Sequence, residues 1–192
     1  MKSLILIGGG GHCKSCIDVI ETEGKYTIAG ILDSIKQADD RVLGYPVLGN
    51  DSMLEELALK GHAFLITIGH IKTPAPRIAL YNRIEAMGAE MPVIVSPRAH
   101  VSKHAKVGKG SIIMHFSLIN AAAEIGHNCI INSRALVEHD AVIGNHCHVS
   151  TGTLINGGAK VGDFSFVGSG AVLREGITLT ENSFVKANSL VK

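Results

Sequence analysis

The chain has 192 residues, of which 46% are hydrophobic, 18% are charged and only 4% are aromatic. This balance excludes a disordered chain, and the length suits one large domain or two small ones. A formal net charge of +1 gives no general attraction to nucleic acid or to an acidic membrane surface, so neither partner is expected. Without a signal peptide or an apolar stretch of about 18 residues, the four cysteines are expected to be reduced thiols of a cytoplasmic protein.

The first half of the chain alternates between short apolar runs and amphipathic segments. Gly24, Gly61 and Gly88 follow the amphipathic segments and suit C-terminal helix caps. This alternation is typical of a parallel sheet, so residues 1–92 are expected to form a small Rossmann-like α/β domain. The predicted strands are Leu4–Ile7, Thr27–Leu32, Phe64–Ile68 and Val93–Val95, and the predicted helices are Cys13–Glu23, Asp51–Lys60 and Arg77–Met87.

The second half, residues 93–192, has a six-residue repeat. From Val101 to Val191 every sixth residue is Ile, Leu or Val, and the residue two positions earlier is Ala, Ser, Cys or Thr except at Ile177. A second period of eighteen residues appears in Gly108, Gly126, Gly144 and Gly162. Three hexapeptides per coil predict a triangular parallel β-helix, with small residues near its tight bends and coils about 4.8 Å apart.

The first predicted strand runs into the glycines Gly8–Gly11 and then into a predicted helix. Backbone N–H groups at such a helix start favour phosphate. The dinucleotide fingerprint is incomplete, because Cys13 stands where its third glycine is expected, while Asp33 ends the second strand where an acid can bind a ribose. We therefore expect a nucleotide-diphosphate group rather than NAD, and the alternative is a tight turn without a ligand.

His139 is the candidate catalytic residue because Glu138 and Asp140 flank it. One carboxylate can hold the imidazole in one tautomer and raise its basicity, while the other ring nitrogen accepts a proton. Eighteen residues later, Gly157 and Gly158 place bare backbone over the same pair in the next coil. The sequence favours a general base but does not choose between the two carboxylates, and the alternative is a solvated histidine at a coil corner.

The remaining histidines and cysteines give weaker signals. His115, His127 and His139 are twelve residues apart and fall on different faces, so one chain is not expected to hold a metal, although a zinc site across a subunit interface stays open. Cys129 and Cys147 are eighteen apart and are expected to stack in the core. The pair at positions 13 and 16 is compatible with packing or with redox chemistry.

These residues together make the chain similar to the sugar acetyltransferases of the PglD/NeuD type, within the hexapeptide-repeat acyltransferases. The motifs that carry the resemblance are Gly8–His12, Asp33, Gly69 and the stretch from Asn132 to Gly157. The resemblance implies a left-handed parallel β-helix over residues 93–192 that binds acetyl-CoA and carries catalysis, and a nucleotide-sugar-binding domain over residues 1–92. It also implies a homotrimer with active sites between neighbouring subunits.

The resemblance further implies a role for individual residues. His139 is the expected general base and Asp140 the acid that supports it, where some relatives carry Glu. No metal is expected, and Lys192 ends the sequence without the tail that often touches CoA in relatives. The residues expected along acetyl-CoA are Asn132, His148, Gly157, Ser169 and Ala187, and those expected at the nucleotide sugar are Gly10, Gly11, His12, Asp33, Ser34 and Gly69.

The implied activity is acetyl-CoA-dependent N-acetylation of a UDP- or GDP-linked 4-amino sugar in glycan biosynthesis, by direct acyl transfer with His139 as the base. The alternative with the same apparatus is O-acetylation of a sugar such as sialic acid. Alternatives of other classes are a non-catalytic β-helix partner protein, a zinc hydratase and an NAD-dependent enzyme. They predict, respectively, no acetyl-CoA binding, a bound metal, and NAD at the glycine-rich turn.

Overall fold

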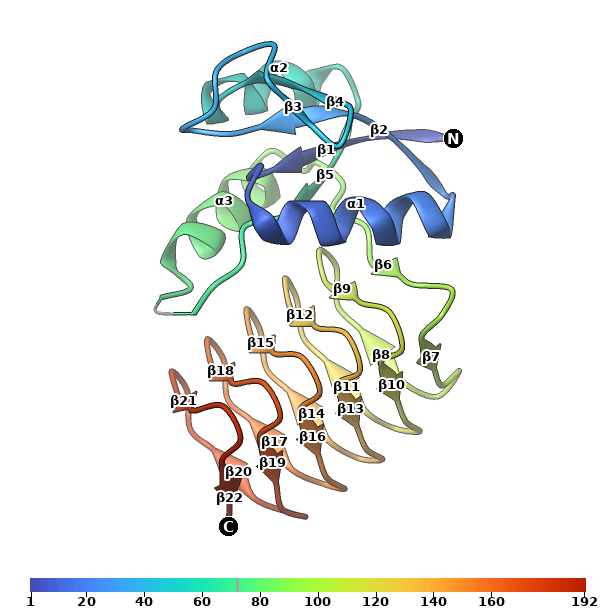
Figure 1. Ribbon diagram of the computed structural model, residues 1–192, viewed down its shortest axis with the longest axis vertical. Coiled ribbons are helices and arrows are strands. Elements are labelled where there is room, and N and C mark those ends of the chain that lie inside the picture. Colours follow the sequence, from blue (N-terminus) through green and yellow to red (C-terminus); the bar gives the residue numbers. More distant parts are fainter. Residues whose placement is uncertain (72) are drawn as a thin grey trace. The chain divides into compact units, whose positions relative to one another are not determined.

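The computed structural model describes residues 1–71 and 73–192 and divides into two compact units (Figure 1). Unit 1 comprises Met1–Gly69 and Ala75–Pro92, and unit 2 comprises His70–Pro74 and Val93–Lys192. Unit 1 is an α/β unit, and unit 2 is a parallel β-helix. Within the described residues, none of the helices combines the length and the apolar character needed to cross a membrane.

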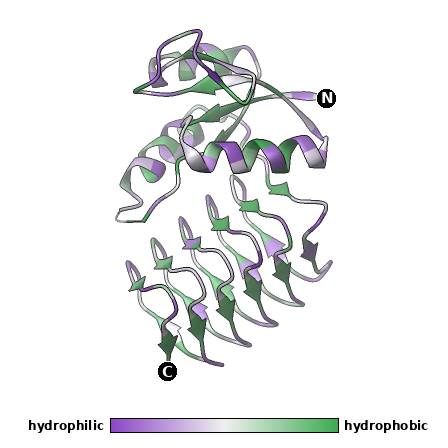
Figure 2. Cartoon of the chain, viewed as in Figure 1, coloured by the Kyte–Doolittle hydropathy of each residue, from purple (hydrophilic) through white to green (hydrophobic). Residues whose placement is uncertain are grey.

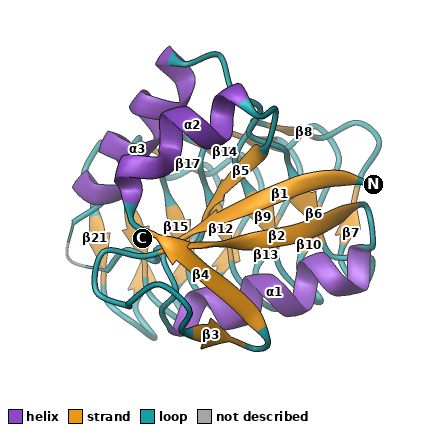
Figure 3. Ribbon diagram, turned by 90° about the horizontal axis from the view of Figure 1, so that it is seen from above, coloured by secondary structure: helices purple, strands orange, loops and turns teal. Residues whose placement is uncertain are grey.

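Unit 1 is built on one sheet with the strand order β3-β4-β2-β1-β5 (Figure 3). β4, β2, β1 and β5 run parallel, and β3 pairs antiparallel with β4. The carboxyl ends of the four parallel strands therefore share one edge of the sheet, where ligands bind in open α/β sheets. The elements in chain order are β1 (Lys2–Ile7), α1 (Gly11–Glu23), β2 (Tyr26–Leu32), β3 (Arg41–Val42), β4 (Tyr45–Gly49), the 3-10 turn η1 (Asp51–Met53), α2 (Leu54–Leu59), β5 (Ala63–Ile66) and α3 (Ala75–Ala86).

The apolar runs of unit 1 explain its buried elements. β1 is buried from Leu4 to Ile7 and β5 along its whole length, as expected of parallel strands covered on both faces. α1 buries one stripe, and its apolar and polar residues alternate along the ribbon (Figure 2). Gly24 adopts a left-handed conformation and its N–H donates to Ile20 O at 2.9 Å, which confirms the predicted helix cap.

The structure of unit 1 differs from the prediction at β3 and β4, which the sequence pattern missed. β4 contains Pro46, which lacks an N–H donor, and it ends in a glycine, so it carries few signals of a strand. The predicted helix from Asp51 is also divided into η1 and α2. The consequence is that Gly49 at the carboxyl end of β4 pairs with Leu32 at the carboxyl end of β2, which the sequence did not indicate.

Unit 2 confirms the hexapeptide interpretation. Its strands are two residues long and form three sheets, each of which gains one strand per coil (Figure 1). We call them the first, second and third faces. The first face contains β6 (Ile94–Val95), β9 (Ile112–Ile113), β12 (Ile130–Ile131), β15 (His148–Val149), β18 (Phe166–Val167) and β21 (Phe184–Val185); the second contains β7 (His100–Val101), β10 (Leu118–Ile119), β13 (Leu136–Val137), β16 (Leu154–Ile155), β19 (Val172–Leu173) and β22 (Leu190–Val191); the third contains β8 (Lys106–Val107), β11 (Glu124–Ile125), β14 (Val142–Ile143), β17 (Lys160–Val161) and β20 (Thr178–Leu179).

Stacking of equivalent residues holds the coils together. Parallel pairing joins residues eighteen apart, such as Leu118 with Leu136, and the Leu118 N–H donates to Ala135 O at 3.0 Å. The aliphatic residues at every sixth position point inward and form one continuous core with the small residues that precede them. Each coil therefore buries its apolar side chains against its neighbours, as in other repeat proteins.

The bends of the β-helix depend on backbone conformation as well as on small side chains. Every sixth residue from Gly110 to Asn188 has a positive φ, including the nonglycine residues Phe116, Arg134 and Asp140. The tight bend falls one residue before the buried small residue that the sequence pattern identified. Since a left-handed conformation costs an L-residue roughly 1–2 kcal/mol, the stacked coils must supply the compensating free energy.

Candidate active site

His139 lies at the corner between the second and third faces, which we call the catalytic corner. Its ring Nδ1 is 2.8 Å from Asp140 Oδ2. Because a carboxylate only accepts hydrogen bonds, the proton lies on Nδ1 and Nε2 keeps its lone pair. Both side chains are exposed, and the hydrogen bond to Asp140 raises the pKa of His139 above its ordinary value.

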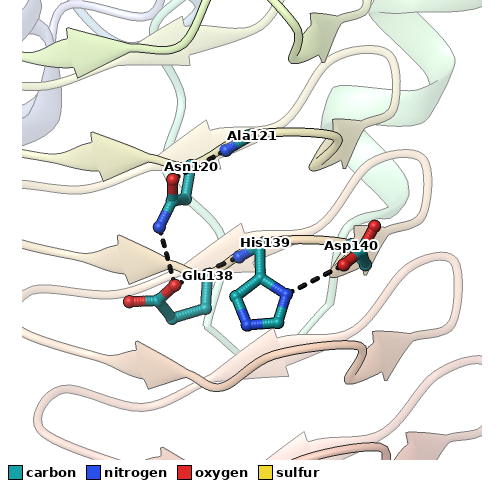
Figure 4. A network of polar contacts seen from close by, with 5 residues as sticks. All are labelled: Asn120, Ala121, Glu138, His139 and Asp140. Atoms are coloured by element: carbon teal, nitrogen blue, oxygen red, sulfur yellow. Dashed lines mark hydrogen bonds and ion pairs between the residues drawn. The ribbon is translucent and has the colours of Figure 1, made fainter.

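Glu138, the other carboxylate beside His139, has a different partner (Figure 4). Glu138 Oε2 accepts a hydrogen bond from Asn120 Nδ2 at 2.7 Å and from the His139 backbone N–H at 3.2 Å. Glu138 therefore joins the catalytic corner to the preceding coil. The sequence did not choose between the two carboxylates, and the structure shows that Asp140 is the one that contacts the imidazole.

Gly157 lies directly against the imidazole in the next coil. A Cβ atom built on Gly157 would be 2.8 Å from His139 Cε1 and 2.9 Å from Nε2. Such distances are shorter than van der Waals contact, so a side chain at residue 157 would displace the ring. The spacing of eighteen residues correctly predicted this juxtaposition, and the ring edge that carries the lone pair faces bare backbone.

The other residues expected along acetyl-CoA gather at a different corner, between the first and second faces, which we call the asparagine corner. Asn132 Nδ2 lies 3.5 Å from His148 Nε2, and Ser169 Oγ lies 2.9 Å from Ser150 Oγ. Ala187 occupies the equivalent position one coil beyond Ser169. The second face separates this corner from the catalytic corner within one chain, and six residues of extended backbone span at most about 20 Å.

His148 is held by contacts at both ring nitrogens. Its Nδ1 lies 2.7 Å from the His70 carbonyl oxygen, which can only accept, so Nδ1 carries the proton. Nε2 faces Asn132 Nδ2 on the other side of the ring. The ring is 7% exposed and packs edge-on against Phe166, with ring centroids 5.2 Å apart. These contacts hold the His148 ring in one orientation beside Asn132.

A cavity of about 310 Å³ follows the edge of the unit 1 sheet where the parallel strands end. Gly10 is the N-cap of α1, no side chain caps the helix, and its first turn contains no acid. The N–H groups at this helix start are therefore oriented for an anion. The lining residues are Ile7, Gly8, Gly10, Gly11, His12, Leu32, Asp33, Ser34, Ile35, Asp51, Thr67, Ile68 and Gly69, which include all six residues expected at the nucleotide sugar.

Asp33 fastens the glycine-rich turn to the loop after β2. Its Oδ2 accepts from Gly9 N–H at 2.6 Å, and its Oδ1 accepts from the N–H groups of Ile35 and Lys36, both at 2.9 Å. Partial burial alone would raise the pKa of Asp33, but these three donors and the Lys36 charge outweigh it and lower the pKa. Asp33 therefore shapes the cavity as well as lining it.

His12 has a buried neighbour that the sequence did not connect with the site. Its Nε2 lies 3.4 Å from the sulfur of Cys16, one turn further along α1. Burial raises the pKa of the Cys16 thiol, so the thiol is protonated and can hold the imidazole in place. Cys13 is also buried, and neither cysteine forms a disulfide.

The described part of the chain contains no group of three or more His, Cys, Asp or Glu side chains placed to hold a metal ion. Cys129 and Cys147 are buried in the β-helix core, as predicted from their spacing. Three residues that the sequence did not single out, Ile35, Asp51 and Thr67, also line the unit 1 cavity. Ile35 and Thr67 could have been found from their positions close to Asp33 and Gly69, whereas Asp51 depends on how the strands are ordered.

Two family models match the chain. The model of the PglD N-terminal domain matches residues 3–84, and the model of the bacterial transferase hexapeptide (six repeats) matches residues 122–157. No curated protein matches the chain.

Three solved structures are similar over the full length of this chain. PerB from Caulobacter crescentus, solved in complex with CoA and GDP-perosamine, is 33% identical, with a TM-score of 0.92 over 100% of this chain and 89% of that one. The acetyltransferase domain of PglB from Neisseria gonorrhoeae is 27% identical, with a TM-score of 0.91 and 92% of its chain covered. WeeI from Acinetobacter baumannii is 20% identical, with a TM-score of 0.77 and 96% covered, and shares the fold.

Fold and comparisons together define an acetyltransferase built on a left-handed parallel β-helix of hexapeptide repeats. More particularly, the chain belongs to the PglD/NeuD-type hexapeptide acyltransferases, because it carries the PglD N-terminal domain in front of the repeats.

Proposed function

We propose that this protein transfers the acetyl group of acetyl-CoA to the amine of a nucleotide-linked amino sugar. The observation that carries the proposal is the His139–Asp140 pair, whose free Nε2 edge lies against Gly157 on an exposed corner of an acetyltransferase β-helix. The similarity to a protein solved with CoA and GDP-perosamine supports both substrates. An amino sugar carried by a nucleotide also suits a second unit with a glycine-rich turn.

His139 and Asp140 together remove the proton that the acceptor amine loses during acetyl transfer. Acetyl-CoA supplies an activated carbonyl, and a neutral amine attacks it without a covalent enzyme intermediate. Nε2 of His139 takes the amine proton, because Nδ1 already carries the proton donated to Asp140. Asp140 then faces the imidazolium and stabilises its charge, so the raised pKa of His139 makes it a stronger base.

The remaining residues bind the two substrates. Gly157 provides bare backbone along which the narrow arm of acetyl-CoA fits beside His139, and the asparagine corner provides Asn132, His148, Ser169 and Ala187. In unit 1, Gly10, Gly11 and His12 receive the diphosphate, while Asp33, Ser34 and Gly69 complete the walls of the cavity. In this proposal residues 1–92 provide the nucleotide-sugar domain and residues 93–192 the catalytic domain.

The arrangement of the corners favours a site shared between copies of the chain. The second face lies between the catalytic corner and the asparagine corner, so the two groups lie at opposite edges of that face in a single chain. Its outward residues form an apolar stripe, in which Leu118, Leu154 and Leu190 are 37%, 38% and 57% exposed. Packing of such faces around a threefold axis would bury the stripe and bring unlike corners together, so we propose a homotrimer.

The reduced state of the four buried cysteines agrees with the cytoplasmic location that we propose. The same location gives the enzyme access to acetyl-CoA.

The proposal is tested by measuring thiol release from acetyl-CoA with a panel of GDP- and UDP-linked amino sugars and free sialic acid. We expect turnover with a nucleotide amino sugar and a loss of at least about 100-fold in kcat for His139→Ala, because general-base catalysis contributes 10²–10⁴-fold. His104→Ala is the matched control, since His104 is an exposed histidine at an earlier bend of the same corner. Turnover that survives in His139→Ala, or acetylation of sialic acid alone, would contradict the proposal.

A further inference from the structure

The unit 1 cavity has an acidic end whose role the proposed function leaves unassigned. Four strand ends follow one another along the cavity in the order β5, β1, β2, β4, and they contribute Thr67–Gly69, the glycine-rich turn, Asp33–Ile35 and Asp51. Because the diphosphate belongs at the glycine-rich turn, the nucleoside extends either toward β5 or toward β2 and β4.

The end of β5 contributes no free polar side chain that could hydrogen-bond a nucleotide base. Thr67 is buried, and its hydroxyl donates to the carbonyl oxygens of Ile7 and Gly8 at 3.0 and 2.7 Å. The two residues that follow are Ile68 and Gly69, which carry no polar side-chain atom. His12 lies against Gly69, but it belongs to the glycine-rich turn and its Nε2 contacts Cys16, so the end of β5 itself adds no side chain that would read the hydrogen-bonding edge of a base.

The β4 end, in contrast, presents the carboxylate of Asp51. In residues 1–71 and 73–192 this carboxylate has no hydrogen-bond or ion-pair partner, although the Asp51 backbone carbonyl accepts from Arg83 Nη2 at 3.2 Å. Asn50 caps η1, since its Oδ1 accepts from Ser52 N–H at 3.0 Å, so Asp51 is not needed as the cap. The Asp33 N–H donates to Gly49 O at 2.9 Å, which ties the β4 end to the β2 end.

Ile35 supplies a second, independent feature at the same end of the cavity. Its side chain is 91% exposed, although it is a large aliphatic residue that lines the cavity. Its backbone N–H donates to Asp33 Oδ1 at 2.9 Å, which holds the loop that carries this side chain beside the cavity. An apolar side chain held in this way fits the flat face of a base, which would remove it from water.

The hydrogen-bonding capacity of the Asp51 carboxylate favours guanine over uracil. A carboxylate has two acceptor oxygens and no donor, so it complements two adjacent N–H donors. Guanine offers such a pair at N1 and at its exocyclic amine, whereas uracil offers a single N–H between two carbonyl oxygens that a carboxylate repels. A site built to pair with a donor discriminates strongly against a base that lacks it.

We propose that Asp51 is the specificity-determining residue of the nucleotide site, and that it selects a guanosine-diphosphate-linked sugar with Ile35 covering one face of the guanine. This inference rests on the proposed function, because it assumes that the cavity holds a nucleotide sugar.

Titration calorimetry of the full-length protein with free nucleoside diphosphates tests the proposal. We expect GDP to bind at least about 10-fold more tightly than UDP, and than inosine diphosphate, which lacks the exocyclic amine, since a hydrogen bond to a charged group accounts for such a factor. Asp51→Asn should lose at least about 10-fold in GDP affinity and gain affinity for xanthosine diphosphate, whose C2 carbonyl accepts from the new amide. Glu56→Gln, an exposed acid on α2 outside the cavity, should bind as the wild type does.

Ile35→Ser provides a second variant that does not depend on Asp51. It should weaken GDP and inosine diphosphate by a similar factor, because guanine and hypoxanthine are both purines and present the same flat face. An unchanged melting temperature shows that each variant is folded. Equal binding of UDP and GDP by the wild type, or an unchanged GDP-to-UDP ratio in Asp51→Asn, would overturn the guanine assignment and leave the acetyltransferase intact. If no nucleoside diphosphate binds while acetyl-CoA does, both the assignment and the proposed nucleotide sugar fail.

Discussion

In unit 2 the candidate base is positioned by the stacking of repeated coils. In unit 1 the cavity is formed by the ends of four strands whose order in the sheet differs from their order in the sequence. In unit 2, His139 and Gly157 meet because each coil stacks on the previous one at an interval of eighteen residues. In unit 1, Asp33 and Asp51 reach the same cavity only because β2 and β4 are neighbours in the sheet.

The two units are therefore expected to tolerate substitution at different kinds of position. The corners of the β-helix share one backbone conformation and carry residues as different as Phe116, Asp140 and Gly158. Corner side chains are therefore replaceable unless they do chemistry or contact the next coil. The loops of unit 1 are each unique, so a single backbone change there affects several walls of the cavity at once. Four substitutions test this contrast.

The largest effect is expected for Leu154→Asp on the second face of unit 2. A carboxylate in the apolar stripe would have to be buried without a partner in the proposed trimer, so we expect monomers and a loss of at least about 100-fold in turnover. Light scattering and thiol release measure the two results. Thr178→Asp places the same charge on the third face and should leave assembly and activity unchanged; an active monomer of Leu154→Asp would contradict a shared site.

Gly8→Ala tests the uniqueness of the unit 1 turn. Gly8 has φ of +103°, and a Cβ there would overlap the Ile68 side chain. We expect a loss of roughly 2–4 kcal/mol in the stability of unit 1, from backbone strain and overpacking, together with a rise in KM for the nucleotide sugar. Thermal unfolding monitored in both units should show unit 2 unaffected. Gly44→Ala also has a positive φ but open space around it, and it controls for strain alone.

Gly157→Ala tests contact between coils at the catalytic corner. The new methyl group would displace the His139 ring, and we expect kcat to fall by about 10- to 100-fold, since small misplacements of a catalytic group have effects of this size. Gly158→Ala is the matched control, because its φ of +66° resembles that of Ala122 at the equivalent bend and no atom lies within 4 Å of the added carbon. Equal activity of the two variants would show that the ring is not held against Gly157.

Asp140→Asn is expected to have the smallest effect at high pH and a distinctive pH dependence. The hydrogen bond from His139 to Asp140 raises the pKa of the histidine, so the wild-type rate should increase with pH through that raised pKa as the base loses its proton. Removing the carboxylate lowers the pKa, which moves this limb to lower pH while reducing the plateau by about 10-fold or more. A pH profile of kcat/KM measures both, and Glu138→Gln should not shift the limb in the same way, because Glu138 bonds Asn120 instead of the ring.

The sequence predicted the β-helix almost completely, because its core pattern repeats and every coil must bury the same kinds of side chain at the same positions. Inward aliphatic residues, stacked cysteines and the meeting of His139 with Gly157 all followed from counting by six and by eighteen. The glycine-rich turn and the caps at Gly24, Gly61 and Gly88 were also predictable, since each depends on local backbone freedom. The roles of individual residues at the two substrates stay predictions that the substitutions above address.

Three features of the two candidate sites depend on contacts that form only in the folded protein. The tertiary structure assigned Asp140 rather than Glu138 to the imidazole, because Asn120 of the preceding coil engages Glu138. It separated the catalytic corner from the asparagine corner by the width of the second face, and it brought Asp51 to the cavity through the missed strand β4. In each case the decisive contact joins residues that neither local propensity nor the period of the repeat relates, so it exists only once the chain has folded.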